Sequence, residues 1–264
     1  MLKNKHIVII GGTTGLGLSA SKAFIGQGAK VIAVGRNPEN NNAAQLQFED
    51  SGLVFTGDAS HENTASEAID LCIKTWGSFD CLYHVAGGSG RKMGDGPLHE
   101  VSLEGWIKTI DLNLTSIMLS NRAAIRSFLA NKRGGSILNM GSVLAYSPAP
   151  HYFGTHVYAA VKAGIIGLSK SLAAYYAKEN IRINVIAPGL VETPMAQRAA
   201  KDADILSYIA TKQPLDGGRI GKPSDLDAAA CYFVSDLSAF TTGQVLAIDG
   251  GWGISEGQIS STTK

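Results

Sequence analysis

The sequence predicts an α/β fold, a doubly wound parallel sheet of the Rossmann type with about seven strands flanked by helices. Two observations carry this prediction. Short runs of β-branched residues, beginning with residues 6–10, alternate along the chain with segments of helical character. A glycine-rich turn over residues 11–17 follows the first run and leads into a helical segment over residues 18–24. Strand, glycine turn and helix in this order are typical of a dinucleotide-binding unit.

The composition is that of one globular domain spanning residues 1–264. Hydrophobic residues make up 45% of the chain and charged residues 17%, and the 31 glycines provide for many tight turns. A net charge of +1 gives no support for nucleic-acid or membrane binding. Three scattered cysteines are too few for a disulfide framework or a metal cluster, so we expect no metal and three buried thiols. The first strand starts too early for a signal peptide, and no apolar run reaches about 18 residues, so we expect a cytoplasmic protein.

The glycine turn supplies candidate contacts to a cofactor pyrophosphate. The start of the following helix offers free N–H groups and the positive end of the helix dipole, and glycines let the backbone approach the phosphates. A merely flexible turn is the alternative, which the flanking strand and helix disfavour. The candidates are Gly11, Thr13, Thr14, Gly15, Leu16 and Gly17.

The end of the second strand, residues 30–34, indicates which dinucleotide is bound. An acidic residue at this point commonly bonds the ribose 2′-hydroxyl of NAD, but the next acid here is Glu39, beyond a proline. Arg36 stands near the strand end instead, and a guanidinium suits a 2′-phosphate. A solvated surface arginine is the alternative. The sequence therefore favours NADP(H), with NAD(H) as a possibility.

Asp58 follows the third strand, residues 53–55. Its carboxylate could accept a hydrogen bond from an adenine amino group, cap a helix beginning near Ser60, or do both. Ala59 beside it is a further candidate contact of the cofactor. A helix over residues 62–76 then leads to the fourth strand, residues 80–85.

A flexible loop follows the fourth strand and extends to Pro97. It opens with Ala86 and Gly87, two further candidate contacts of the cofactor, and it carries Arg91 and Lys92. These cations could meet an anionic group on a substrate, although a solvated loop tip explains them equally well.

Two polar residues further along the chain are placed where chemistry could use them. Asn113 lies near the middle of a long amphipathic helix predicted over residues 102–131, where asparagine is mildly unfavourable unless its face is exposed. Ser142 follows the fifth strand, residues 136–140, at the carboxyl edge where open α/β sheets bind ligands. A turn residue is the alternative for Ser142.

Tyr158 and Lys162 form the candidate catalytic pair. They stand four residues apart in a helix predicted over residues 155–178, so they share one helix face. A nearby ammonium should lower the tyrosine pKa from about 10 and make the phenol a proton donor and acceptor. Alone, such a pair is more often an ordinary half-exposed contact.

The remaining chain completes the alternation of strands and helices. A sixth strand over residues 181–186 runs into Pro188 and Gly189. Residues 190–219 form a long polar and helical excursion, which we expect to cover the site as a lid. A helix over residues 224–235 and a strand over residues 245–248 follow.

Together these motifs resemble the short-chain dehydrogenase/reductase family along the entire chain. The resemblance implies a seven-stranded Rossmann sheet in which Tyr158 is the acid/base, Lys162 holds the nicotinamide ribose and Ser142 holds the substrate oxygen. It also implies that Asn113 anchors a water in a proton relay. Thr193 and residues 186–190 would position the nicotinamide. Family members are commonly homotetramers that pack through the helices carrying Asn113 and Tyr158.

Three departures from the family pattern stand out. Ile10 precedes the first glycine where the family usually has threonine. His84 and Val85 replace two asparagines before Ala86, and we expect His84 to be a satisfied core histidine. The interval before Tyr158 is a few residues longer than usual. This insertion, residues 147–154, should shape the pocket with His151, Tyr152 or Phe153 facing the substrate.

The sequence favours an NADP(H)-dependent oxidoreductase that interconverts a carbonyl and a secondary alcohol, such as a 3-oxoacyl-thioester reductase or another ketone reductase. One alternative is a lyase-type relative that uses the serine and tyrosine without a nicotinamide. A second is a non-catalytic nucleotide-binding regulatory protein on the same fold. The intact glycine turn and lysine disfavour the first, and the four polar groups together disfavour the second.

Overall fold

A seven-stranded parallel sheet forms the centre of the molecule, in the order β3-β2-β1-β4-β5-β6-β7. The computed structural model describes residues 1–259. The order reverses between β1 and β4, so the carboxyl ends of these strands border a crevice where α/β sheets bind ligands. The predicted fold class is confirmed. The strands are β1 (His6–Ile10), β2 (Lys30–Gly35), β3 (Gly52–Thr56), β4 (Cys81–His84), β5 (Gly135–Met140), β6 (Ile181–Pro188) and β7 (Val245–Ile248).

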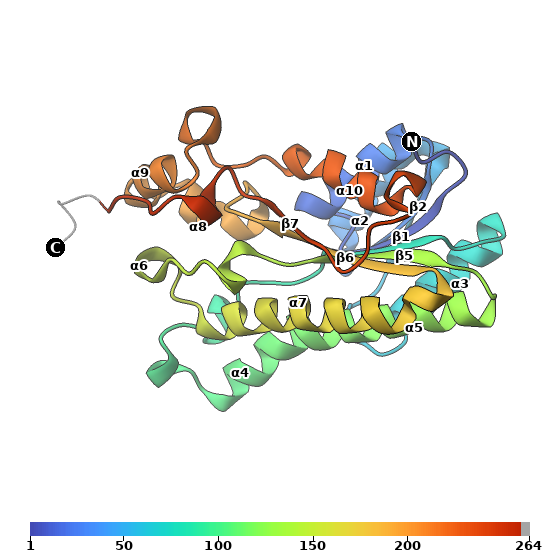
Figure 1. Cartoon of the computed structure of the whole chain (residues 1–264), viewed down its shortest axis with the longest axis horizontal. Helices are drawn as coiled ribbons and strands as arrows, with labels where there is room; N and C mark the ends of the chain where they lie inside the picture. The colour runs from blue at the N-terminus through green and yellow to red at the C-terminus, as the bar shows by residue number, and fades with distance from the viewer. Residues whose placement is uncertain (260–264) are drawn as a thin grey trace.

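Helices cover both faces of this sheet (Figure 1). One face packs against α1 (Gly15–Gly26), α2 (Pro38–Phe48) and α10 (Asp227–Val234). The other packs against α3 (Thr64–Trp76), α5 (Ser116–Ala130) and α7 (His156–Tyr176). Because both faces are covered, the central strands are nearly continuous apolar runs, as parallel strands usually are.

The helix predicted over residues 102–131 is not one regular helix. The chain forms α4 (Leu103–Ile110), a π-helical turn (Asp111–Thr115) and α5. Asn113 lies in this turn and is fully buried. The predicted helix is confirmed over this span, with a π-helical turn inside it that carries Asn113 and its tertiary contacts, described below. Such π-turns are frequent at functional sites.

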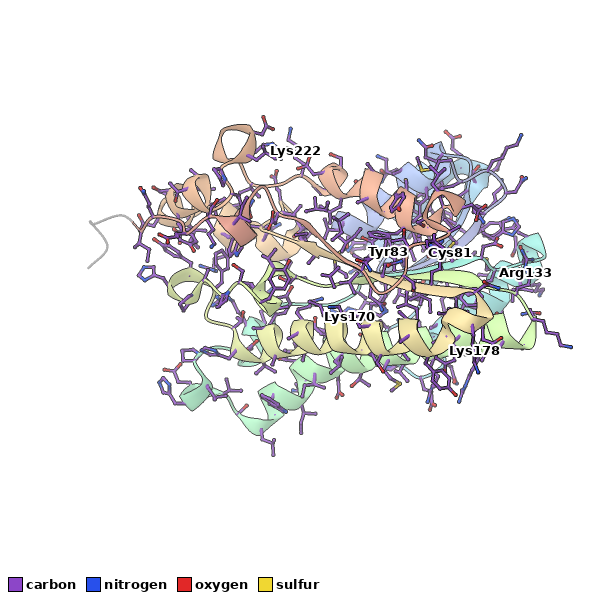
Figure 2. The ribbon with its side chains drawn as sticks, in the orientation of Figure 1. Cys81, Tyr83, Arg133, Lys170, Lys178 and Lys222 are labelled. Atoms are coloured by element: carbon purple, nitrogen blue, oxygen red, sulfur yellow. The ribbon has the colours of Figure 1, made fainter. Side chains whose placement is uncertain are left out.

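Short helices gather at the carboxyl edge of the sheet, at the left of Figure 1. They are α6 (Pro150–Phe153), α8 (Gln197–Ala200) and α9 (Ala203–Lys212). A separate apolar cluster joins them, with Trp252 of the C-terminal segment and Tyr208 of α9 among its buried members. The opposite end of the molecule carries Arg133 and Lys178, as Figure 2 shows.

One helix passes a test that the sequence analysis did not anticipate. Residues 156–179 meet the length and mean hydropathy of a membrane span, although Lys162 and Lys170 interrupt the apolar sequence. The small residues of α7, together with few charges, produce this composition. The test is weak evidence of a membrane, because apolar helices of folded domains pass it as well.

The three cysteines are free and buried, as expected. Burial raises the pKa of Cys72 and Cys81 to about 12 and that of Cys231 to about 11. These thiols therefore stay protonated and behave as small apolar side chains.

Candidate active site

A cavity of about 590 Å³ opens at the carboxyl ends of β1, β4, β5 and β6. The glycine turn forms one part of its wall, and Ser142, Tyr158 and Lys162 form another. The remainder combines apolar side chains of the insertion, of the segment after β6 and of the C-terminal region with three cations, Arg91, Lys92 and Arg198. One cavity therefore holds both the candidate dinucleotide contacts and the candidate catalytic residues.

Tyr158 and Ser142 both line this cavity, with the Ser142 hydroxyl within hydrogen-bonding reach of the phenol. Tyr158 lies in the first turn of α7, and Ser142 follows the last residue of β5, where its hydroxyl accepts a hydrogen bond from the Leu144 amide at 3.2 Å. Burial raises the pKa of the Tyr158 phenol to about 12, and the Ser142 hydroxyl opposes this shift only in part. The phenol is therefore protonated at neutral pH and can act as a proton donor.

Lys162 lies one turn beyond Tyr158, with its Nζ atom 5.5 Å from the centre of the tyrosine ring. Its ammonium donates a hydrogen bond to the carbonyl of Met140 at 2.8 Å. Burial lowers the pKa of Lys162 to about 7, so the side chain is only partly charged near neutrality. The sequence predicted a lowered pKa for Tyr158, but burial dominates both groups and the pKa of the phenol is raised instead.

Asn113 fixes the start of the loop after β4. Its Oδ1 atom accepts a hydrogen bond from the amide of Gly88 at 3.0 Å, and its Nδ2 group donates to the carbonyls of Gly88 and Thr109 at 3.0 and 2.9 Å. A side chain on Gly87 would collide with Asn113, because a Cβ atom there would lie 2.7 Å from Oδ1. Both hydrogens of the Asn113 amide group and one lone pair of its oxygen are thus used in positioning the backbone.

His84 is a satisfied core histidine, as the sequence indicated. Its Nδ1 atom lies 2.7 Å from the Ser120 hydroxyl and its Nε2 atom 3.2 Å from the carbonyl of Ala86. Burial, with a smaller contribution from Lys162, lowers the pKa of His84 to about 3. The ring is therefore neutral at physiological pH.

The residues of the glycine turn fit the pyrophosphate of a dinucleotide. Helix α1 begins at Gly15 with no acidic residue in its first turn and no side-chain cap from Thr14, so its first N–H groups remain available to an anion. Gly15 has a φ of +51°, and a Cβ atom there would lie 3.5 Å from Pro194. The absence of this atom leaves space between the turn and the segment that begins at Thr193.

Arg36 and Asp58 lie at the adjacent ends of β2 and β3, with Arg36 Nη1 3.4 Å from Asp58 Oδ2. Asp58 also accepts hydrogen bonds from the amide and hydroxyl of Ser60 at 2.9 and 2.7 Å. Burial opposes ionisation of Asp58, but these hydrogen bonds and the Arg36 charge together lower its pKa. The cap predicted near Ser60 closes a turn rather than a helix, because α3 begins only at Thr64.

Most of the predicted site residues line the cavity. They are Gly11, Thr14, Gly15, Leu16, Ala86, Gly87, Ser142, Tyr158, Lys162, Pro188, Gly189 and Thr193. The others lie outside its lining. They are Thr13, Gly17, Arg36, Asp58, Ala59 and Asn113. Gly17 has an internal role, since a Cβ atom there would lie 1.9 Å from the carbonyl oxygen of Gly11.

Comparison with known proteins places this geometry in a family. A family model described as enoyl-(acyl carrier protein) reductase matches residues 11–253. The chain is 35% identical over 254 residues to 3β-hydroxysteroid dehydrogenase 1 of Eggerthella lenta, covering 95% of this chain and 94% of that protein. The chain belongs to the short-chain dehydrogenase/reductase family. Its sequence relatives and its solved structural neighbours are dehydrogenases and reductases, and the chain is an oxidoreductase of this NAD(P)-dependent type.

Other members of the family show the range of its substrates. The chain is 31% identical to cis-4-hydroxycyclohexanecarboxylate dehydrogenase of Sinomonas cyclohexanicum, covering 93% of this chain and 95% of that protein. It is 35% identical to 3-oxoacyl-acyl-carrier-protein reductase of Chlamydia trachomatis, covering 95% and 98%. Among solved structures, a short-chain type dehydrogenase/reductase from Mycobacterium ulcerans superposes with a TM-score of 0.89 at 28% identity, covering 97% and 92%. A 3-ketoacyl-acyl-carrier-protein reductase from Brucella melitensis, solved with NADH, gives a TM-score of 0.84 at 27% identity, covering 96% and 100%.

In this short-chain dehydrogenase/reductase, Asp95 is a residue of the site that the sequence reading missed. Asp95 is 5% exposed, and its two carboxylate oxygens accept hydrogen bonds from the amides of Val157 and Tyr158 at 3.0 and 2.8 Å. Thr155, at the N-cap position of α7, makes no side-chain cap. Asp95 therefore caps the catalytic helix from the loop after β4. The separation of more than 60 residues hid this contact from any local pattern.

The insertion forms α6 and packs against α9 and the C-terminal segment. Of the three candidates, Phe153 lines the cavity, whereas His151 and Tyr152 do not. The Tyr152 ring packs against Tyr208 with ring centres 5.1 Å apart. Trp252, which the sequence reading also missed, donates from its indole nitrogen to the carbonyl of Ser147 at 3.1 Å and packs edge-on against Phe153. The insertion is thus held against the C-terminal segment.

Proposed function

We propose that this reductase interconverts a ketone and a secondary alcohol, with Tyr158 transferring the proton. The observation that carries the proposal is the shared cavity, in which Ser142 and Tyr158 face the space between the glycine turn and the apolar walls. The nicotinamide cofactor, when bound, supplies or accepts the hydride at the carbonyl carbon. The substrate oxygen would lie between the two hydroxyl groups, where a donor can reach it.

Each polar residue then has a distinct task. Ser142 holds the carbonyl oxygen by donating its hydroxyl proton. Tyr158 donates a proton to the same oxygen during reduction, which suits a phenol whose pKa is raised to about 12. Lys162 lies close enough to stabilise the phenolate that remains after proton transfer. The negative charge of the phenolate would in turn favour the charged form of Lys162. Asn113 keeps the backbone at Gly88 in place beside these groups.

We further propose a preference for NADP(H), with NAD(H) as the alternative cofactor. Arg36 supports the proposal, because it is 68% exposed at the end of β2 and pairs with Asp58 only at 3.4 Å. Such a side chain can turn toward a 2′-phosphate. The relative solved with NADH supports the alternative. Calorimetric titration with NADPH and NADH tests the preference, and tighter binding of NADH would overturn it.

We also propose a cytoplasmic homotetramer. Helices α4 and α5 carry exposed large apolar side chains, and α7 exposes several small residues. Exposed apolar surface of this kind is typical of an interface. The large side chains are Leu103, Trp106, Ile107, Met118 and Leu129. Light scattering of the purified protein measures its mass in solution, and a monomer at micromolar concentration would contradict the proposal.

The test of the proposed chemistry is Tyr158→Phe, assayed with both cofactors on a ketosteroid, 4-oxocyclohexanecarboxylate and a 3-oxoacyl thioester. We expect kcat to fall by about 10² to 10⁴, the usual contribution of a general acid, while cofactor affinity stays nearly constant. Tyr175→Phe is the matched control, because Tyr175 lies on the same helix and is 68% exposed. Retention of more than a tenth of the activity in Tyr158→Phe would rule out the assigned role.

A further inference from the structure

Three cations meet the cavity on its substrate side. Arg91 and Lys92 come from the loop after β4, and Arg198 comes from α8. The residues that line the cavity include no aspartate or glutamate. Among residues 1–259, no salt bridge involves any of these three cations. These charges make the electrostatic potential in this part of the pocket positive, because no acidic side chain lines its wall.

The two arginines converge on a single neutral acceptor. Arg91 Nη2 donates to the carbonyl oxygen of Tyr152 at 3.1 Å, and Arg198 Nη2 donates to the same oxygen at 3.2 Å. Burial and the nearby charge of Arg198 lower the pKa of Arg91, whereas Asp95 acts in the other direction. Asp95 is already bonded to the two amides at the start of α7. One carbonyl cannot balance two guanidinium charges, so the pair is set to receive an anion.

The backbone presents Arg91 from a well-defined turn rather than from a loose loop tip. The turn, Arg91–Met93, lies between Gly90 and Gly94, which have φ values of +75° and +94°. The amides of Met93 and Asp95 both donate to the carbonyl of Gly90. A Cβ atom on Gly90 would lie 2.6 Å from the Thr109 hydroxyl, so this approach requires glycine.

A purely structural role, holding α6 in place, does not explain the pair. One neutral donor would satisfy the Tyr152 carbonyl, and Trp252 already anchors the insertion through Ser147. Two exposed guanidinium groups that donate to the same oxygen atom can also donate together to one anion. Their planar arrays of N–H donors suit the oxygen atoms of a carboxylate or a phosphate.

We propose that the substrate of this reductase carries an anionic oxygen group, which Arg91 and Arg198 bind while the ketone or alcohol lies at Ser142 and Tyr158. The inference rests on the proposed function, because it names the substrate class of the same cavity. Lys92 adds charge at the mouth. Between the two ends the wall is mainly apolar, with Val143, Leu144, Phe153, Leu190 and Met195. The substrate class is therefore an apolar oxo acid or hydroxy acid, or an oxoacyl thioester whose carrier contributes phosphate oxygens.

Matched pairs of ketones test the inference. The first pair is 4-oxocyclohexanecarboxylate and its methyl ester, and the second is 6-oxoheptanoate and its methyl ester. The third pair, 3-oxobutanoyl-coenzyme A and the phosphate-free N-acetylcysteamine thioester, separates a thioester phosphate from a free carboxylate. We expect kcat/KM to favour the anionic member of at least one pair by about tenfold to hundredfold, the size of a hydrogen bond to a charged group. The Arg91→Gln/Arg198→Gln double variant should abolish this ratio.

Arg133→Gln is the matched control, because Arg133 lies at the opposite end of the molecule (Figure 2) and should leave the ratio as it is in the native chain. An equal kcat/KM for charged and neutral members, or a ratio that persists in the double variant, would overturn the inference.

A binding measurement separates this inference from the proposed chemistry. Calorimetry with cyclohexanecarboxylate and methyl cyclohexanecarboxylate, neither of which can be reduced at a carbonyl, should show tighter binding of the acid that depends on the two arginines. If no ketone turned over but this binding persisted, the proposed function would fail and the anion site would stand. Equal binding of acid and ester, combined with equal turnover of the ketone pairs, would leave the chemistry in place and refute the anion site.

Discussion

The cap that Asp95 places on the catalytic helix should be worth several kcal/mol. Its carboxylate accepts two amide hydrogen bonds, at 3.0 and 2.8 Å, and is 5% exposed. Hydrogen bonds to a charged group contribute about 1.5–3 kcal/mol each, and an acidic group at a helix N-terminus adds about 0.3–1 kcal/mol. Taking the lower values, Asp95→Ala should reduce the free energy of unfolding by about 3 kcal/mol. For a chain of this size that lowers Tm by about 6–12 °C.

Calorimetry and urea unfolding measure this loss, and Asp202→Ala provides the matched control. Asp202 also accepts two amide hydrogen bonds at a helix start, both at 3.1 Å, but it belongs to α9 and is only partly buried. An ordinary cap of this kind contributes about 1 kcal/mol. Asp95→Asn keeps one acceptor and should lose about half as much as Asp95→Ala. A Tm decrease for Asp95→Ala no larger than that for Asp202→Ala would refute the reasoning, because the buried carboxylate would then add nothing beyond a surface cap.

Two further changes test charges at the site. Burial lowers the pKa of Lys162 from 10.5 to about 7, so between these values the unfolded chain binds a proton that the folded chain does not, and stability should rise with pH. Urea unfolding at pH 8 and pH 9 measures how steeply the free energy of unfolding rises with pH. In Lys162→Met this rise should be smaller than in the native chain by up to about 1.4 kcal/mol per pH unit. An equal rise in both proteins would contradict the shifted pKa. A charge-assisted hydrogen bond from Arg36 would set the preference for NADPH over NADH at about tenfold to hundredfold. Arg36→Asp should reverse this preference, mainly through the KM values of the two cofactors. An unchanged ratio of the two KM values would show that Arg36 points to solvent.

The sheet was predictable because its information is local. Buried parallel strands are short runs of apolar, mostly β-branched residues, and each run of this kind became a strand within one or two residues of its expected bounds. The glycine turn was predictable for the same reason, since the strand, turn and helix follow one another directly. The helical spacing of Tyr158 and Lys162 was a weak signal alone. Together with the glycine turn and the other motifs it indicated a family, which the comparisons confirm.

The features that were missed depend on contacts between distant segments. Asn113 lies in a π-helical turn and binds Gly88, and Asp95 caps a helix that begins more than 60 residues later. Arg198 was one polar residue of a long excursion, and only the fold brings it beside Arg91. The lowered tyrosine pKa was a wrong expectation because helical spacing reveals a neighbouring charge but not the burial that outweighs it.

The turn between Gly90 and Gly94 limits how this reductase can acquire new substrates over evolutionary time. Its outward residues, Arg91 and Lys92, belong to no salt bridge among residues 1–259, so mutation can vary them at small cost to folding. Asp95, which directly follows this turn, caps the helix that carries Tyr158, so mutation there is penalised whatever the substrate. Selection can thus change the substrate preference of the enzyme by altering Arg91 and Lys92, while Asp95 stays constant and keeps the catalytic helix in place.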